Sequence, residues 1–172
     1  MLFPSLEAAL KGVFNRVMTT LSLGGNKIGV EGAIAIAEAL KVTAVVTTLH
    51  LGMNPIGAEG AIAIAEALKV NAVLTELKLS RNNIGPEGAI AIAEALKVNA
   101  VVTELELGGN EIGDEGAKAI AEALKINVVL TSLDLRFNSN MGDAGRQAVR
   151  DAVKGRSGFQ LHCQAMYQYL PE

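Results

Sequence analysis

The sequence predicts an α/β solenoid in which short parallel strands and helices alternate in repeats of 28 residues. Three observations lead to this fold class. A Leu-x-Leu pair recurs at a constant step of 28 residues, an asparagine follows each pair at the same offset, and one apolar segment is copied almost unchanged between them. Self-similarity at a fixed step of this length indicates supersecondary units that stack and share one core.

The Leu-x-Leu pairs predict one short strand in each repeat. Alternating apolar and polar residues suit a strand that packs one face against a core. In the third repeat this pattern buries Leu77 and Leu79 and exposes Glu76, Lys78 and Ser80. The five pairs are Leu21-Ser22-Leu23, Leu49-His50-Leu51, Leu77-Lys78-Leu79, Leu105-Glu106-Leu107 and Leu133-Asp134-Leu135.

The copied segment predicts a helix with one buried stripe. It reads GAIAIAEALKV at 32–42, 60–70 and 88–98, and GAKAIAEALKI at 116–126. In the second copy Gly60, Ile64 and Leu68 fall four residues apart, which places them on one helix face. An acidic residue stands at each helix start and a lysine at each end, as the helix dipole favours.

The repeated pattern L-x-x-L-x-L-x-x-N-x-I/L resembles leucine-rich repeats over roughly residues 18 to 161. More narrowly, I-G-x-E-G-A-x-A-I-A-E-A-L is similar to the ribonuclease-inhibitor-like subfamily, which also occurs in the sensor regions of NLR immune receptors. The resemblance implies a horseshoe with parallel strands on the concave face and α-helices on the convex face. It also implies a ladder in which asparagine side chains bond the backbone of adjacent turns. These are Asn26, Asn54, Asn82, Asn110 and Asn138.

The spacing of the two element types independently favours a curved stack. Neighbouring strands lie about 4.8 Å apart, whereas packed helices need about 8 Å or more. Because each repeat ties one strand to one helix, we expect the stack to bend with the helices outside. The abundant alanines allow the helices to approach near the lower limit.

The chain is expected to form one domain over residues 1–172. We expect an N-terminal helical cap at 1–17, the repeats at 18–140, and a C-terminal capping helix, short strand and tail at 141–172. End caps are needed because terminal repeats have no outer neighbour. Asn140 stands where the other repeats carry isoleucine, and one extra residue follows it, so the last turn is expected to pack differently.

Composition argues against several functional classes. The net charge of −3 gives no basic excess for nucleic acid, and no apolar run approaches membrane-spanning length. A single cysteine, Cys163, can form neither an internal disulfide nor a zinc cluster, which favours a reducing, cytoplasmic setting. Aromatic residues make up only 3%, so no cofactor or aromatic-walled pocket is expected.

The exposed strand positions differ in every repeat, whereas helices and turns are nearly copied. This contrast predicts a non-catalytic protein–protein interaction module with its binding surface on the concave face. The first two repeats are small and mostly neutral there and the later ones charged, which favours a partner with a basic or mixed-charge segment. The expected contact residues are His50, Glu76, Lys78, Arg81, Glu104, Glu106, Asp134 and Arg136.

A second surface is suggested by Ile34, Ile62 and Ile90 on the helices. The fourth copy carries Lys118 at the same position, so this position is expected to reach solvent. Two interpretations remain open. The isoleucines pack sideways between adjacent helices, or they form an apolar strip for self-association or docking. The chain is accordingly expected to be a monomer or a weak homo-oligomer.

Other functions also stay open at this stage. The carboxylates of neighbouring strands would suit acid–base chemistry, but a wet, open face offers little burial to separate their pKa values. The Ran-activating proteins have a related repeat scaffold, so GTPase activation is one alternative. A purely structural or engineered consensus array is another, because three helical segments are identical; recent duplication would explain that identity equally well.

Overall fold

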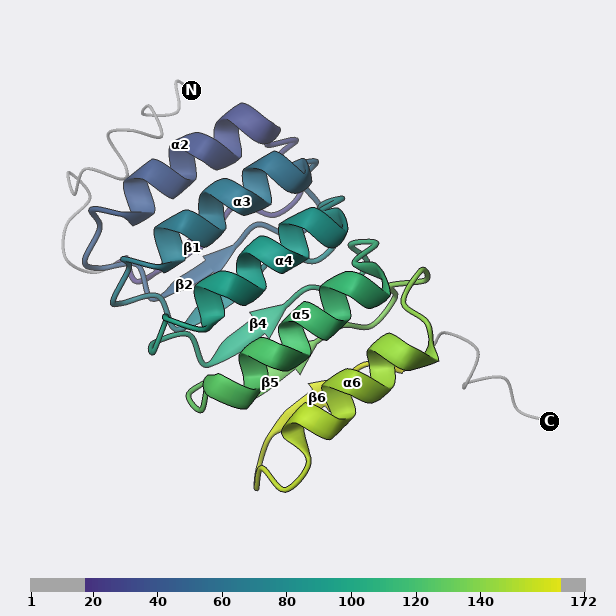
Figure 1. Ribbon diagram of the computed structural model, residues 1–172. Helices are drawn as coiled ribbons and strands as arrows, with labels where there is room; N and C mark the ends of the chain where they lie inside the picture. The colour runs from purple at the N-terminus through teal and green to yellow at the C-terminus, as the bar shows by residue number, and fades with distance from the viewer. Residues whose placement is uncertain (1–17, 165–172) are drawn as a thin grey trace.

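The computed structural model describes residues 18–164, which form a stack of alternating strands and helices (Figure 1). The strands are β1 (Thr20–Ser22), β2 (Thr48–His50), β3 (Glu76–Lys78), β4 (Glu104–Glu106), β5 (Ser132–Asp134) and β6 (Gln160–His162). The helices are α2 (Val30–Leu40), α3 (Gly57–Leu68), α4 (Gly85–Leu96), α5 (Gly113–Ile126) and α6 (Asp143–Val153). The helical cap expected at 1–17 and the tail at 165–172 lie outside the described residues.

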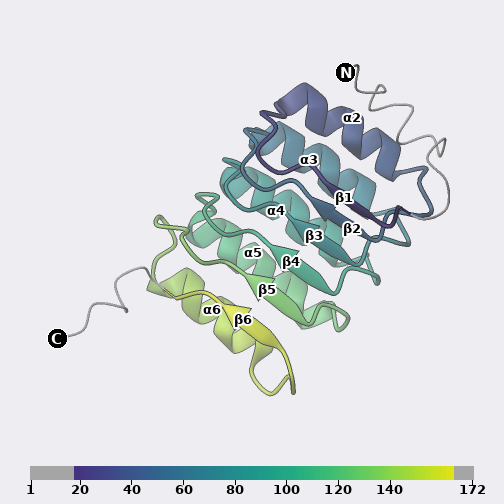
Figure 2. The ribbon, with the colours of Figure 1, turned by 180° about the vertical axis from the view of Figure 1, so that it is seen from behind.

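The strands form one parallel sheet in chain order, from β1 to β6. Figure 2 shows the strand side of the stack, with the helices behind it. Equivalent residues pair directly, so Leu49 lies opposite Leu77, and Leu77 lies opposite Leu105. The predicted leucine-rich-repeat solenoid is therefore confirmed.

The core lies between the sheet and the helix row. Leu77 and Leu79 from β3 and its following turn are fully buried, as are Ile92 from α4 and Ile64 from α3. The polar residues beside the leucines remain on the opposite face of the sheet. The alternation read from the sequence therefore corresponds to the two faces of the sheet.

Small residues set the distance between adjacent helices. A Cβ atom added at Gly88 would lie 2.9 Å from the Cβ of Ala61 on α3 and 2.4 Å from the Cγ2 of Ile84. The same arrangement recurs at Gly116, whose added Cβ would lie 2.8 Å from the Cβ of Ala89. Glycine is needed at these positions because a larger residue would push the helices apart.

An asparagine ladder connects successive turns after the strands. Asn110 donates from Nδ2 to the carbonyls of Leu79 and Leu107, at 2.8 and 3.0 Å, and its Oδ1 accepts from the backbone N–H of Asn82 at 2.7 Å. Asn54, Asn82 and Asn138 make related bonds. Asn26, in the first turn, is exposed, and within the described residues its side chain donates to the carbonyl of Gly24. Each buried rung satisfies backbone groups of two repeats.

A second ladder, absent from the sequence-based expectations, connects the loops after the helices. Asn99 donates to the carbonyl of Leu68 at 2.8 Å, and its Oδ1 accepts from the backbone N–H groups of Val101 and Val102. Asn71 and Asn127 repeat these contacts. The asparagines recur at the same 28-residue step, so the signal was present in the sequence.

The last repeat reaches the same fold with different residues. Asn140 accepts from the backbone N–H of Gly113 through its Oδ1 at 3.0 Å, where earlier turns use an asparagine backbone carbonyl. Met141, one residue later, is buried. Asp114 of α5 accepts from the N–H groups of Gly142 and Gly145 and so caps α6. The extra residue of this turn is thereby accommodated.

Candidate protein-binding face

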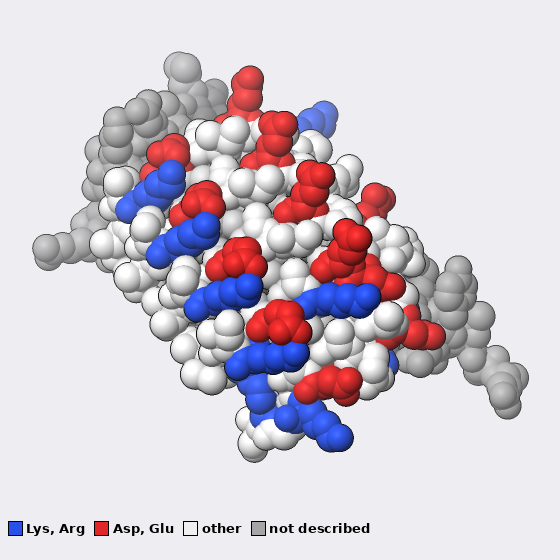
Figure 3. All heavy atoms as spheres, viewed as in Figure 1, with Lys and Arg blue, Asp and Glu red and all other residues white. Residues whose placement is uncertain are grey.

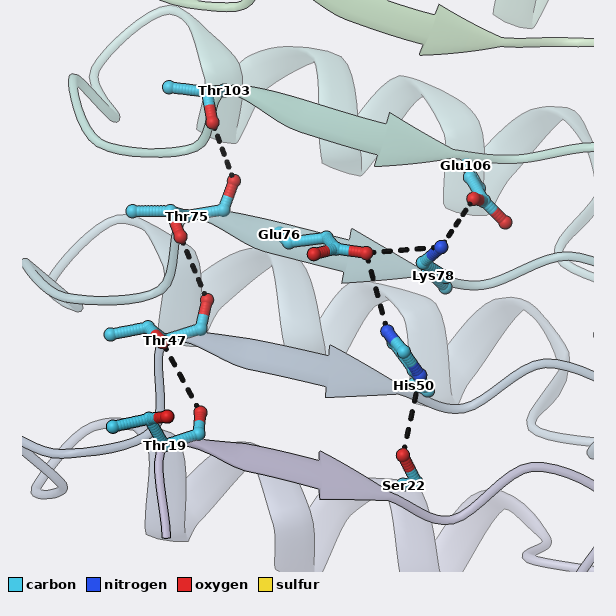
Figure 4. Close-up of polar contacts among 9 residues, drawn as sticks. All are labelled: Thr19, Ser22, Thr47, His50, Thr75, Glu76, Lys78, Thr103 and Glu106. Atoms are coloured by element: carbon cyan, nitrogen blue, oxygen red, sulfur yellow. Dashed lines mark hydrogen bonds and ion pairs between the residues drawn. The ribbon is translucent and has the colours of Figure 1, made fainter. Parts of the chain in front are cut away.

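A chain of polar contacts crosses the exposed side of the first four strands (Figure 4). The Nδ1 atom of His50 lies 3.3 Å from the Oγ of Ser22, and its Nε2 lies 3.3 Å from Oε1 of Glu76. Lys78 then bridges two strands, with Nζ 3.0 Å from Glu76 and 2.9 Å from Oε1 of Glu106. Four residues predicted as partner contacts therefore form one network: His50, Glu76, Lys78 and Glu106.

The network stabilises the charged forms of Glu76 and Lys78. Partial burial raises the pKa of Glu76, but hydrogen bonds from Lys78 and His50 outweigh it, so this pKa lies below its usual value. The pKa of Lys78 is raised above its usual value, mainly by its hydrogen bond to Glu106 and then by that to Glu76. At neutral pH Glu76 and Lys78 therefore keep opposite charges.

Asp134 and Arg136 form a second pair at the end of β5. The guanidinium of Arg136 donates to the carboxylate of Asp134 from Nε at 3.0 Å and from Nη2 at 2.6 Å, and the backbone N–H of Arg136 adds a bond at 2.9 Å. Burial raises the pKa of Asp134, but the bonds from Arg136 outweigh this effect and lower it overall. Bidentate pairing of this kind gives both side chains a defined orientation.

The remaining predicted contacts lie beside these two groups. Glu104 is exposed and stands opposite Glu76 and Ser132 in the strand register. Arg81 is exposed in the turn after β3, where its backbone is left-handed with φ of 57°. The Cγ of Arg81 lies 3.1 Å from a Cβ added at Gly109. The aliphatic part of the Arg81 side chain therefore lies over the turn that follows β4.

A row of threonines borders the face where the strands begin. Thr75 donates from Oγ1 to the carbonyl of Thr47 at 3.1 Å, and Thr103 donates to the carbonyl of Thr75 at 3.2 Å (Figure 4). Thr47 and Thr131 make the same contact with the preceding repeat. Sequence reasoning did not single out these residues, although they recur at the 28-residue step. They hold adjacent strands together beside the charged network.

The helix side carries charged rows with an uncharged strip between them (Figure 3). Ile34, Ile62 and Ile90 are between 37% and 41% exposed, and Lys118 is exposed at the equivalent position. These isoleucines are therefore neither fully open nor fully packed between helices. Their role in self-association stays a prediction.

Residues 18–164 contain neither a cluster of metal ligands nor a helix of membrane-spanning character. No group of three or more His, Cys, Asp or Glu side chains in this part of the chain is arranged to hold a metal ion. No helix within these residues is long and apolar enough to cross a bilayer.

Comparison with known proteins identifies the repeat family. The family model described as "Leucine Rich repeat" matches residues 14–37, 44–65, 70–93, 98–121 and 127–149. No curated protein gives a significant match. Among solved structures, the chain is similar to "Leiomodin-1 Actin-Binding Site 2 (ABS2)", with 30% identity, a TM-score of 0.75, and coverage of 88% of this chain and 89% of that one. The chain therefore belongs to the leucine-rich repeat family.

Proposed function

We propose that this chain is a non-catalytic protein-binding module whose concave strand face holds a positively charged segment of a partner. The single observation that carries the proposal is the ordered row of hydrogen-bonded polar and charged side chains across β2, β3 and β4. We also propose that the chain belongs to the ribonuclease-inhibitor-like subfamily of these repeats and that it is located in the cytoplasm. The motif I-G-x-E-G-A and the single, unpaired Cys163 support them.

The charges on this face favour a basic partner over an acidic one. Lys78 is shared by Glu76 and Glu106, so this group of three carries one excess negative charge. Glu104 adds a second carboxylate on the same strand as Glu106. Asp134 is balanced by Arg136, and exposed Arg81 in the turn after β3 offsets one of the remaining negative charges. A lysine or arginine from a partner would find its strongest attraction at β4.

The hydrogen bonds within the row also favour binding. Association normally costs entropy because long side chains must be ordered at the interface. Here Glu76 and Lys78 are held by contacts with neighbouring strands before any partner arrives. Glu106 is held by Lys78 in the same way. A partner would therefore meet a surface whose carboxylates are already oriented.

Charge reversal tests this proposal. A fluorescein-labelled 12-residue peptide that alternates lysine and serine serves as the probe, and fluorescence anisotropy at low salt measures its binding. We expect the double variant Glu104→Lys, Glu106→Lys to weaken binding at least about tenfold, because two attractive charges become repulsive.

A matched control changes the same number of charges on the helix side. The double variant Glu66→Lys, Glu94→Lys alters net charge equally but leaves the strand face intact. It should bind the peptide nearly as tightly as the unaltered chain. Equal losses in the two double variants, or no peptide binding at all, would refute the strand face as a site for basic segments.

Actin is the second candidate partner, supported by the similarity to the actin-binding site of leiomodin-1. Co-sedimentation with filamentous actin and anisotropy with labelled monomeric actin test the two forms separately. If actin binds through the proposed face, the Glu104→Lys, Glu106→Lys variant should bind it more weakly and the helix-side control should not. If neither form of actin binds, actin is excluded as a partner, and the experiment with the basic peptide still tests the strand face.

A further inference from the structure

An apolar ridge follows the loops that leave the helices, away from both the strand face and the isoleucine strip. One valine or isoleucine per repeat is largely exposed there: Val42 at 76%, Val70 at 63%, Val98 at 64% and Ile126 at 58%. Val128 extends the row and is 80% exposed. Large apolar side chains exposed in a continuous row commonly indicate an interaction surface.

The second asparagine ladder holds these loops in their outward conformation. Asn99 accepts hydrogen bonds from the backbone N–H groups of Val101 and Val102 and donates to the preceding repeat. The residues on either side of it, Val98 and Ala100, are exposed. Asn71 and Asn127 make the same bonds in the loops beside Val70 and Ile126, whereas Thr43 occupies this position beside Val42.

The ridge ends in a hollow between the last two repeats. This hollow has a volume of about 430 Å³ and is lined by Leu124, Val128, Leu130, Ala152 and Phe159, with Lys125 at its side. Its lining also includes Thr131, Ser157 and Arg156. The guanidinium of Arg156 lies 4.6 Å from the centre of the Phe159 ring and donates to the carbonyls of Asn127 and Leu130. Val128 belongs to both the ridge and the hollow, so the two form one surface.

A row of lysines borders the ridge: Lys41, Lys69, Lys97 and Lys125. Each Nζ donates to a glutamate one turn earlier in its helix, at 2.5 to 2.6 Å. An ammonium group has three N–H donors, so each retains capacity for a second carboxylate. Figure 3 shows these red and blue pairs along the helices, with uncharged surface beyond the blue side chains.

We propose that the ridge and hollow bind a partner segment that combines apolar residues with aspartate or glutamate. Apolar side chains of the segment lie along the valine row, its carboxylates bond the lysine row, and one bulky apolar side chain occupies the hollow. This inference does not depend on the strand-face proposal.

Differential peptide selection tests the ridge directly, with random peptides in place of the natural partner. A random 16-residue display library is selected against the unaltered chain and, in parallel, against the double variant Val70→Ser, Val98→Ser. We expect peptides enriched only on the unaltered chain to combine leucine, isoleucine or phenylalanine with aspartate or glutamate. Their affinity, measured by anisotropy, should fall at least about tenfold in the ridge variant.

Two controls locate the binding surface. The double variant Ile62→Ser, Ile90→Ser removes two apolar side chains from the helix strip and should retain peptide affinity, as should Glu104→Lys, Glu106→Lys. The variant Lys69→Gln, Lys97→Gln should weaken binding without affecting the thermal midpoint of unfolding. Basic ridge-dependent peptides, or an absence of ridge-dependent peptides, would overturn the proposal. A dimer by light scattering that the serine variant converts to monomer would also overturn it in favour of self-association.

Discussion

The interior repeats and the last repeat of the described stack reach the same backbone by different means. In the interior, asparagine, glycine and alanine recur at equivalent positions and contact their own counterparts in the next repeat. At the last repeat Asn140, Asp114 and Arg156 perform related tasks with other chemistry. The repeat pattern therefore specifies which backbone groups must be satisfied, and several side chains are able to satisfy them.

The largest expected effect lies in the interior ladder. Asn110→Ala leaves the carbonyls of Leu79 and Leu107 and the N–H of Asn82 without this side chain in a buried site. We expect a loss of about 3 kcal/mol in the free energy of unfolding, measured by urea denaturation. Asn26→Ala, at the exposed end of the same ladder, should cost less than about 1 kcal/mol. Similar losses of unfolding free energy in the two variants would contradict the expectation that a buried interior rung stabilises the fold more than an exposed end rung.

Arg156→Met tests whether the last repeat depends on its substitute residue. Arg156 donates to the carbonyls of Leu124, Asn127 and Leu130. The first two are equivalent to the carbonyls of Leu96 and Asn99, which accept from Asn127 in the second ladder. Methionine preserves an apolar stem beside Phe159 but removes these donors. Unfolding free energy should fall by about 2 kcal/mol because three carbonyls lose a charged donor. Arg156→Lys should recover part of this loss, whereas no recovery would assign the effect to packing alone.

Helix spacing provides a third contrast between interior and end. Gly88→Ala adds a Cβ that meets both Ala61 and Ile84, and we expect destabilisation of about 2 kcal/mol from overpacking. At Gly32 the added Cβ would contact Ile28 alone among the described residues, with its Cγ2 at 2.8 Å, and alanine also improves helix propensity. Gly32→Ala should therefore change stability by less than about 1 kcal/mol. Thermal melts of the two variants measure the difference.

The smallest expected effect is the contribution of two strand-face carboxylates to the pH dependence of stability. The pKa values of Glu76 and Asp134 are lowered in the folded state. Each contributes stability that is present above its unfolded pKa and is lost as pH falls through its folded pKa. Between about pH 5 and pH 3, the double variant Glu76→Gln, Asp134→Asn should lose less stability than the unaltered chain, by under about 1 kcal/mol. Urea midpoints across this range check the sign.

Most of the framework was predictable because its physical requirements repeat. Leu77 and Leu79 indicated their strand by alternation, and Gly60, Ile64 and Leu68 indicated the buried helix face by spacing. The ladder of Asn71, Asn99 and Asn127 was missed, although its step is the same. The sequence shows that these asparagines recur, but it does not reveal which backbone carbonyls in the loops need a side-chain donor.

The strand face was predictable only in part. Direct register placed Glu76, Lys78 and Glu106 on neighbouring strands, as expected from the 28-residue step. Which carboxylate Lys78 contacts depends on side-chain rotamers, and it contacts both. The exposed valine row was missed because Val70 and Val98 follow helix ends, where apolar periodicity no longer indicates burial. Identity of a partner depends on complementary chemistry that this chain alone does not contain.

The unshifted register between neighbouring strands has a consequence for how such a chain changes length. Each junction joins equivalent residues, so Leu49 meets Leu77 as Leu77 meets Leu105. Removal of one whole repeat from the middle would bring equivalent edges together, and insertion of one would replace one junction by two of the same kind. The length of such a chain therefore changes by complete repeats, and each step adds or removes one strand of the exposed sheet face.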